Sequence, residues 1–114
     1  MTAVARGSLR AAGRLLVAAG AVVWLGGQGK PSGAVHHVAM KAVDYEPKRL
    51  VARVGDTIEW ANDDVVAHTA TAKGSFDVNV LPQRRGRASM TTPGTFAYIC
   101  RYHPNMRAEI LVER

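Results

Sequence analysis

Turn-forming residues break the sequence after Ala34 into short runs, spaced eight to twelve positions apart. The runs are rich in β-forming residues, and none keeps a helical period over a useful length. The segments 50–54 and 110–112 show the residue alternation that is typical of strands, so one face of each sheet should pack inward. This pattern is typical of an all-β sandwich, with Trp60 and Phe96 as large core residues. We expect strands over 35–43, 48–54, 57–61, 65–72, 76–80, 87–91, 96–100 and 108–113.

The N-terminal segment has a different composition. Three arginines and no acidic residue precede an apolar run at 15–25, and small residues follow it. This order is typical of a secretory signal peptide. The apolar run is shorter than the roughly 20 residues that span a bilayer, so we expect no stable membrane insertion. Residues 1–34 are predicted to be a signal peptide and residues 35–114 a single exported, periplasmic domain.

Two cleavage sites fit the sequence. Small residues occupy the required positions in Ser32-Gly33-Ala34 and also in Gly27-Gln28-Gly29. Cleavage after Ala34 would make the chain begin Val35-His36-His37, whose amine, amides and second histidine could bind Cu(II) in a square plane. The alternatives are that these histidines simply belong to the first strand, and that the N-terminal segment stays uncleaved on a membrane surface.

Loss of such a leader changes the charge of the protein. The full chain has 15 basic and nine acidic residues, which gives a net charge of +6. Four of the basic residues lie within 1–34, so 11 remain against nine acids and the mature charge is near +2. Nucleic-acid binding is therefore not expected, because it needs a basic stripe. The run of Arg84, Arg85 and Arg87 is more typical of a solvated loop than of a docking patch.

The chain contains one cysteine, Cys100, which cannot form an intrachain disulfide. A domain of about 80 residues is small for a single hydrophobic core. Exported domains of this size commonly need a disulfide or a bound metal for stability. Metal coordination would also protect a lone thiol in an oxidising compartment.

Three side chains with metal-binding atoms follow one another closely, namely Cys100, His103 and Met106. They lie between the last two predicted strands, where a short loop can bring them to one point. His68 is the histidine that remains further inside the predicted sandwich. Two imidazoles, a thiolate and a weak thioether form the ligand set that is typical of blue copper.

Other interpretations of these residues stay open. A cysteine at the end of a strand is often a buried, inert thiol, and Met106 could fill the core. Zinc would use the same cysteine and histidines, although a thioether is an unusual fourth ligand for it. An enzyme with a Cys100–His103 nucleophile pair would need a substrate cleft and oxyanion donors, and neither is evident, so no catalytic residue is predicted.

Two segments resemble the cupredoxin family of copper proteins. Residues 98–113 are similar to the copper-ligand loop and last strand of the family, and residues 45–62 match an earlier part, with His68 six residues later. The two-residue gaps on either side of His103 are similar to those of the amicyanins within this family. The resemblance covers nearly all of residues 37–113.

The resemblance implies a Greek-key sandwich of eight strands or slightly fewer that holds one type 1 copper ion. It also implies that Asn62 ties the His68 strand to the cysteine loop through hydrogen bonds, and that Pro104 stiffens this loop. The implied ligands are His68, Cys100 and His103, with Met106 as the weak axial ligand. The sequence departs from the amicyanin pattern at Ala67, Thr69, Arg101 and Tyr102.

These features predict an exported one-electron carrier, not an enzyme. The electron would pass through His103, whose ring edge should reach the surface. The predicted partners are redox proteins that dock transiently on a monomer, and the resemblance suggests an amine dehydrogenase or a c-type cytochrome. A periplasmic copper-trafficking or storage protein with the same ligands is the alternative.

Overall fold

The computed structural model describes residues 33–114 of the chain. The predicted signal peptide therefore lies outside the described residues, apart from Gly33 and Ala34. Residues 33–114 form nine strands and no helix. This part of the chain therefore contains no helix that could cross a membrane. The strands are β1 (Val35–Met40), β2 (Tyr45–Glu46), β3 (Arg49–Arg53), β4 (Thr57–Asn62), β5 (His68–Ala72), β6 (Phe76–Val80), β7 (Arg85–Ser89), β8 (Gly94–Ile99) and β9 (Arg107–Glu113).

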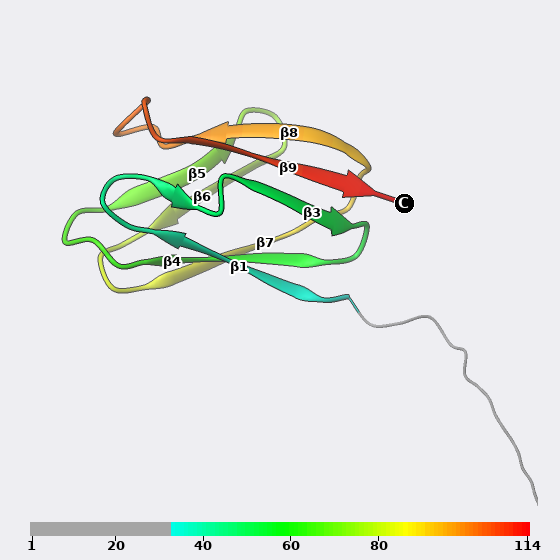
Figure 1. The fold of residues 1–114 in the computed structure, drawn as a ribbon, viewed down its shortest axis with the longest axis horizontal. Coiled ribbons are helices and arrows are strands. Elements are labelled where there is room, and N and C mark those ends of the chain that lie inside the picture. Colours follow the sequence, from blue (N-terminus) through cyan, green and yellow to red (C-terminus); the bar gives the residue numbers. More distant parts are fainter. Residues whose placement is uncertain (1–32) are drawn as a thin grey trace, which may run out of the picture. The chain divides into compact units, whose positions relative to one another are not determined.

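The strands form two sheets that face one another, which confirms the predicted all-β sandwich (Figure 1). One sheet has the order β2-β1-β4-β7 and the other the order β3-β9-β8-β5-β6. The chain changes sheet after β2, β3, β4, β6 and β7, so strands distant in sequence become neighbours. The pairs β1–β4 and β3–β9 are parallel, and the other neighbouring pairs are antiparallel.

Several strand boundaries differ from those predicted. The first strand ends at Met40, because Ala42 and Val43 have φ angles of 53° and 56° and turn the chain towards the unpredicted β2. Residues 65–67 belong to a loop, so β5 begins at His68. The seventh strand runs over Arg85–Ser89 and lies two residues earlier than expected.

The core is built around aromatic side chains from both sheets. Trp60 is fully buried, as predicted, and its Nε1 donates a hydrogen bond to the Tyr98 hydroxyl at 3.2 Å. The rings of Tyr45 and Tyr98 lie 4.6 Å apart between centroids, and both are buried. Burial raises the pKa of Tyr98 to about 12.

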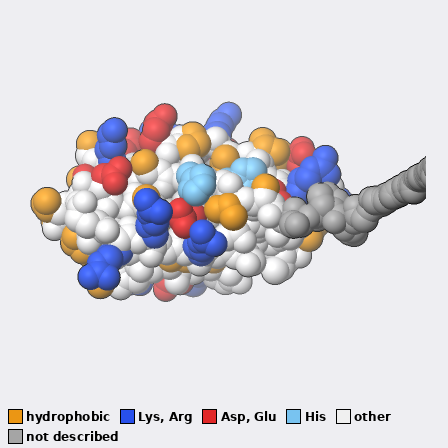
Figure 2. Space-filling view, turned by 90° about the horizontal axis from the view of Figure 1, so that it is seen from below, with side chains coloured by type: hydrophobic (Ala, Val, Ile, Leu, Met, Phe, Trp, Pro, Cys, Tyr) orange, Lys and Arg blue, Asp and Glu red, His pale blue; other side chains and the backbone are white. Residues whose placement is uncertain are grey.

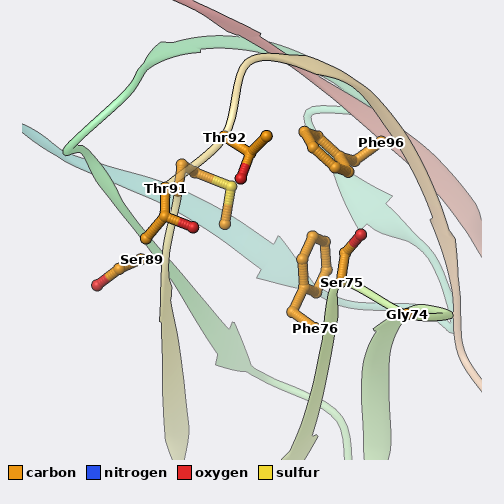
Figure 3. A pocket seen from close by; sticks show the side chains of 8 residues that line it. Gly74, Ser75, Phe76, Ser89, Thr91, Thr92 and Phe96 are labelled. Carbon is orange, nitrogen blue, oxygen red and sulfur yellow. The ribbon is translucent and has the colours of Figure 1, made fainter.

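Phe96, the other predicted core residue, packs against the buried core. It is only half-buried, because it lies near the start of β8 at one end of the sandwich. There it borders a hollow of about 370 Å³ together with Phe76, Thr91 and Thr92 (Figure 3). Tyr98, two residues further along the same strand, takes the central position.

A row of charged side chains crosses the outer face of the four-stranded sheet. His37, Glu59 and Arg87 are register partners on β1, β4 and β7. Glu59 lies 2.9 Å from the Arg87 guanidinium and 3.1 Å from the His37 ring, and its side chain is only 7% exposed. Figure 2 shows basic, acidic and histidine side chains close together on this face. Two members of the predicted basic loop thus lie on a strand, where they pair with a carboxylate.

Asp56, in the turn between β3 and β4, holds the beginning of β1. Its carboxylate accepts hydrogen bonds from His36 Nε2 at 2.8 Å, from Arg53 N at 2.9 Å and from Ala34 N at 2.9 Å. These bonds, with the one from His36 largest, lower the pKa of the Asp56 carboxyl to about 2.

Substitution of Gly86 should test the packing between β6 and β7. A Cβ atom at this position would lie 2.6 Å from Val78 Cγ1 and 3.1 Å from Val80 Cγ2. We expect Gly86→Ala to destabilise the metal-free protein by about 1–3 kcal/mol, measured by denaturant unfolding. Adding Val78→Ala should recover part of this loss, whereas a double variant that is no more stable than Gly86→Ala would contradict the packing argument.

Acid should weaken the Asp56 contacts in a defined direction. The folded pKa of about 2 lies below the ordinary value of 3.8, so this carboxylate stabilises the fold above pH 4 and loses its effect as the pH falls towards 2. We expect Asp56→Asn to be less stable than the wild type at pH 5 and to lose less stability between pH 4 and pH 2. Parallel stability curves for the two proteins would contradict this role.

Candidate metal centre

Three predicted ligands converge at one end of the sandwich. His68 is the first residue of β5, and Cys100 follows the last residue of β8. Cys100 Sγ lies 3.8 Å from His68 Nδ1 and 3.6 Å from His103 Nδ1. One ligand atom from each of these three residues lies within 4.8 Å of the others, so a single ion could contact all three.

The loop that carries Cys100, His103 and Met106 is closed by its own backbone. The Cys100 amide donates to the Met106 carbonyl at 3.1 Å, and the Met106 amide donates to the His103 carbonyl at 2.8 Å. Pro104 therefore occupies the second position of a tight turn, where its fixed φ angle is favourable. Because Ile99 is the register partner of Arg107 on β9, the loop is confined to residues 100–106.

Burial divides the four predicted ligands into two kinds. His68, Cys100 and Met106 are fully buried, whereas His103 is only half-buried. The imidazoles of His68 and His103 lie 5.0 Å apart between ring centroids. His103 is thus the ligand that reaches towards the surface, as the sequence predicted.

The strand of His68 is tied to the cysteine loop by Thr69. The Thr69 amide donates to Cys100 Sγ at 3.4 Å, and the Arg101 amide donates to Thr69 Oγ1 at 2.9 Å. The Cys100 sulfur therefore has a fixed backbone donor on the side of β5. Position 69 had been recognised from the sequence only as a departure from the amicyanin pattern.

The hydrogen bonds of Asn62, for which the family resemblance implied this connection, go to other residues. Its Nδ2 donates to the carbonyls of Val66 at 2.8 Å and Val80 at 3.0 Å, and its Oδ1 accepts from Asp64 N at 2.9 Å. These bonds shape the loop before His68 and fasten it to the end of β6. Asn62 therefore positions His68 indirectly, through its loop.

Asp64 orients the His68 ring. Its Oδ2 lies 2.7 Å from His68 Nε2, and its two carboxylate oxygens also accept from Ala42 N at 2.8 Å and Val43 N at 2.9 Å. A carboxylate can only accept, so Nε2 carries the proton and Nδ1, which faces the sulfur, is free for a metal. Burial opposes ionisation, but the bonds from Val43, His68 and Ala42 outweigh it and lower the pKa of Asp64.

The sequence had indicated only a turn at Asp63 and Asp64. The spacing of four residues between Asp64 and His68 was a signal that could have been used. It does not reveal, however, which of the two aspartates faces the ring.

The N-terminal histidines belong to the first strand. His37 Nδ1 lies 3.1 Å from Glu59, and His36 Nε2 lies 2.8 Å from Asp56. Val35, His36 and His37 are register partners of residues 57–59 on β4. A square-planar copper site on the Val35-His36-His37 backbone would have to compete with this pairing.

A sequence profile for the cupredoxin-like domain matches residues 15–112. The chain belongs to the cupredoxin family. Among curated proteins, this cupredoxin is 30% identical over 83 residues to amicyanin from Paracoccus denitrificans and 24% identical over 87 residues to amicyanin from Paracoccus versutus. Each match covers 67% of this chain and 63% of the relative, which is less than two thirds of the relative's length.

Solved amicyanin structures share the fold. A methionine-to-alanine mutant in its Cu(I) form superposes with a TM-score of 0.63 at 26% identity, over 69% of this chain and 82% of that one. An oxidized proline-to-alanine mutant gives a TM-score of 0.63 at 28% identity, over 71% of this chain and 83% of that one. Within this family, His68, Cys100 and His103 form the candidate copper site of the chain. Two nitrogen donors facing one sulfur fit copper, because sulfur favours Cu(I) and imidazole suits Cu(II).

Removal of the Asp64 carboxylate should weaken metal binding. We expect Asp64→Asn to lower copper affinity about 10–100-fold, because the amide no longer holds the Nε2–H tautomer of His68 as firmly. Copper affinity by competition titration, and the His68 ring tautomer by NMR, would measure the effect.

Asp63→Asn is the matched control, because Asp63 is an exposed neighbour in the same loop. The control should bind copper like the wild type. Equal copper affinity of the two variants would contradict the assigned role of Asp64.

Proposed function

We propose that this cupredoxin is a periplasmic one-electron carrier that holds one copper ion through His68, Cys100 and His103, with Met106 as a weak axial ligand. The observation that supports it best is the site itself, in which hydrogen bonds hold the buried His68 and Cys100 side chains and the third predicted ligand, His103, is half-buried. When bound, copper supplies a couple that accepts and releases one electron. The protein supplies a rigid frame, and a rigid frame suits a site that must change oxidation state with little movement.

Exposed apolar side chains surround the metal end of the sandwich, and we call them the apolar collar. They lie on loops that follow β1, β4, β6 and β8, and Asp64 joins three of these loops through its carboxylate and its carbonyl. The collar consists of Val43, Val65, Val66, Leu81 and Tyr102. Such a patch supports brief docking of a monomer with redox partners, for which the family resemblance suggests an amine dehydrogenase or a c-type cytochrome.

The environment of Cys100 supports a ligand and not a nucleophile. Its side chain is fully buried, and its sulfur accepts a hydrogen bond from Thr69 N. The hollow of about 370 Å³ near Phe76 lies at the other end of the same strands. We therefore propose no catalytic residue in this chain.

An N-terminal signal peptide within residues 1–34, cleaved after Gly29 or after Ala34, and the copper-binding domain that follows it form part of the same proposal. Export would place the site in an oxidising compartment, where a lone thiol needs protection. The residues between 15 and 25 carry the apolar run that supports export.

The visible spectrum tests the ligand set. With Cu(II) the protein should be intensely coloured through charge transfer from the Cys100 thiolate, and Cys100→Ser should lose this band. His37→Ala is a control that removes an imidazole outside the site, and it should keep the colour. A colourless Cu(II) complex of the wild type would contradict the type 1 assignment.

Repeated redox cycling tests the function. An electron carrier should be reduced and reoxidised many times while a competing Cu(I) chelator takes up no copper. Transfer of the copper to the chelator on reduction would instead favour the trafficking or storage function. The colour of the reoxidised protein and the copper content of the chelator are the two measurements.

A further inference from the structure

The chain immediately before β1 is packed tightly against the domain. A Cβ atom at Gly33 would collide with the carbonyl oxygen of Gly55 and would lie 2.8 Å from its carbonyl carbon. Both contacts are to backbone atoms, which cannot turn aside as a flexible side chain can. Only glycine therefore fits at position 33 without a shift of the turn between β3 and β4.

Ala34 uses both of its backbone groups in the fold. Its N–H donates to Asp56 Oδ1 at 2.9 Å, and its carbonyl accepts from Thr57 N at 2.8 Å. The second bond lies at the start of the parallel pairing of β1 with β4, where Val35 is the register partner of Thr57. Ala34 thus behaves as part of the first strand and not as a connection to it.

Asp56 holds this junction through several hydrogen bonds. The same carboxylate that binds Ala34 N also accepts from Arg53 N and from His36 Nε2. Asp56 as a whole is only 7% exposed. The carboxylate therefore joins the start of β1 to the turn that precedes β4.

We propose that processing of the precursor leaves Gly33 and Ala34 on the mature protein, with cleavage after Gly29. This inference rests on the proposed export of the chain. Cleavage after Ala34 would remove Gly33, which fits against Gly55. It would also remove Ala34 and both of its backbone hydrogen bonds. The upstream site has small residues at Gly27 and Gly29, which a signal peptidase accepts.

The position of the new amine has a consequence for metal binding. A chain that begins at Lys30 has its free amine five residues before Val35. The Val35-His36-His37 segment then lacks the terminal amine that square-planar coordination needs. The mature protein should therefore bind one copper ion tightly, at the cysteine site alone.

The direct test is to express the full chain in a Gram-negative host and sequence the N-terminus of the periplasmic protein. A first residue between 30 and 33 supports the inference, and Lys30 is expected. A first residue after Gly33 would overturn it while leaving export intact. A chain that keeps residues 1–29 and stays in the cytoplasm would overturn the export proposal, and this inference with it.

A comparison of defined chains tests the physical reason. Proteins comprising residues 30–114, 33–114 and 35–114 would be released from a fusion partner and melted without metal. The first two should melt at the same temperature, and the third should melt at a lower one. Equal melting of all three would overturn the argument that Gly33 and Ala34 belong to the fold.

Gly33→Ala in the 30–114 chain adds an independent measurement. The added methyl group should lower the melting temperature, because it meets the Gly55 backbone. Lys30→Ala is the control and should melt like the unchanged chain. A Gly33→Ala protein as stable as this control would overturn the close packing.

Discussion

The metal centre depends on the contact between β5 and β8, whose only register pair is Thr71 with Ile99. Continuation of this register towards the metal end would place Thr69 opposite Arg101. At this point side-chain acceptors replace the backbone carbonyls of the ladder. Arg101 N donates to Thr69 Oγ1, and Thr69 N donates to Cys100 Sγ. The sulfur therefore takes the place of a backbone acceptor at this point of the sheet. Sulfur and His68 imidazole meet because two strands are neighbours, although the residues are 32 positions apart.

Two aspartates stabilise the two ends of the sandwich. Asp56 joins Ala34, His36 and Arg53, whereas Asp64 joins Ala42, Val43 and His68. Each carboxylate accepts three hydrogen bonds and connects segments about 20 residues apart. The part of the chain described here contains one cysteine and hence no internal disulfide. Instead of a disulfide, the carboxylates of Asp56 and Asp64 connect β1 and the residues next to it with later loops.

Asp64 also couples local backbone conformation to the metal site. Ala42 and Val43 both have positive φ angles, a conformation that a β-branched residue rarely adopts. Their adjacent N–H groups point to one carboxylate, an arrangement that favours a bound anion. The same carboxylate sets the tautomer of His68. The loop after β1 thus takes part in presenting a ligand that lies more than twenty residues further along the chain.

The sequence by itself determined the all-β class and indicated that Cys100, His103 and Met106 lie in one short loop. Both follow from the spacing of residues along the chain, which is a local property. It also indicated that His103 is the more exposed imidazole, since a short loop leaves one of its residues near the surface. Only the tertiary structure decided that Thr69 and not Asn62 contacts the cysteine loop, that Asp64 holds His68, and that Tyr98 and not Phe96 is central. These outcomes depend on which strands are neighbours and in which register they pair. Long-range pairing of this kind leaves no periodic signal in a single sequence.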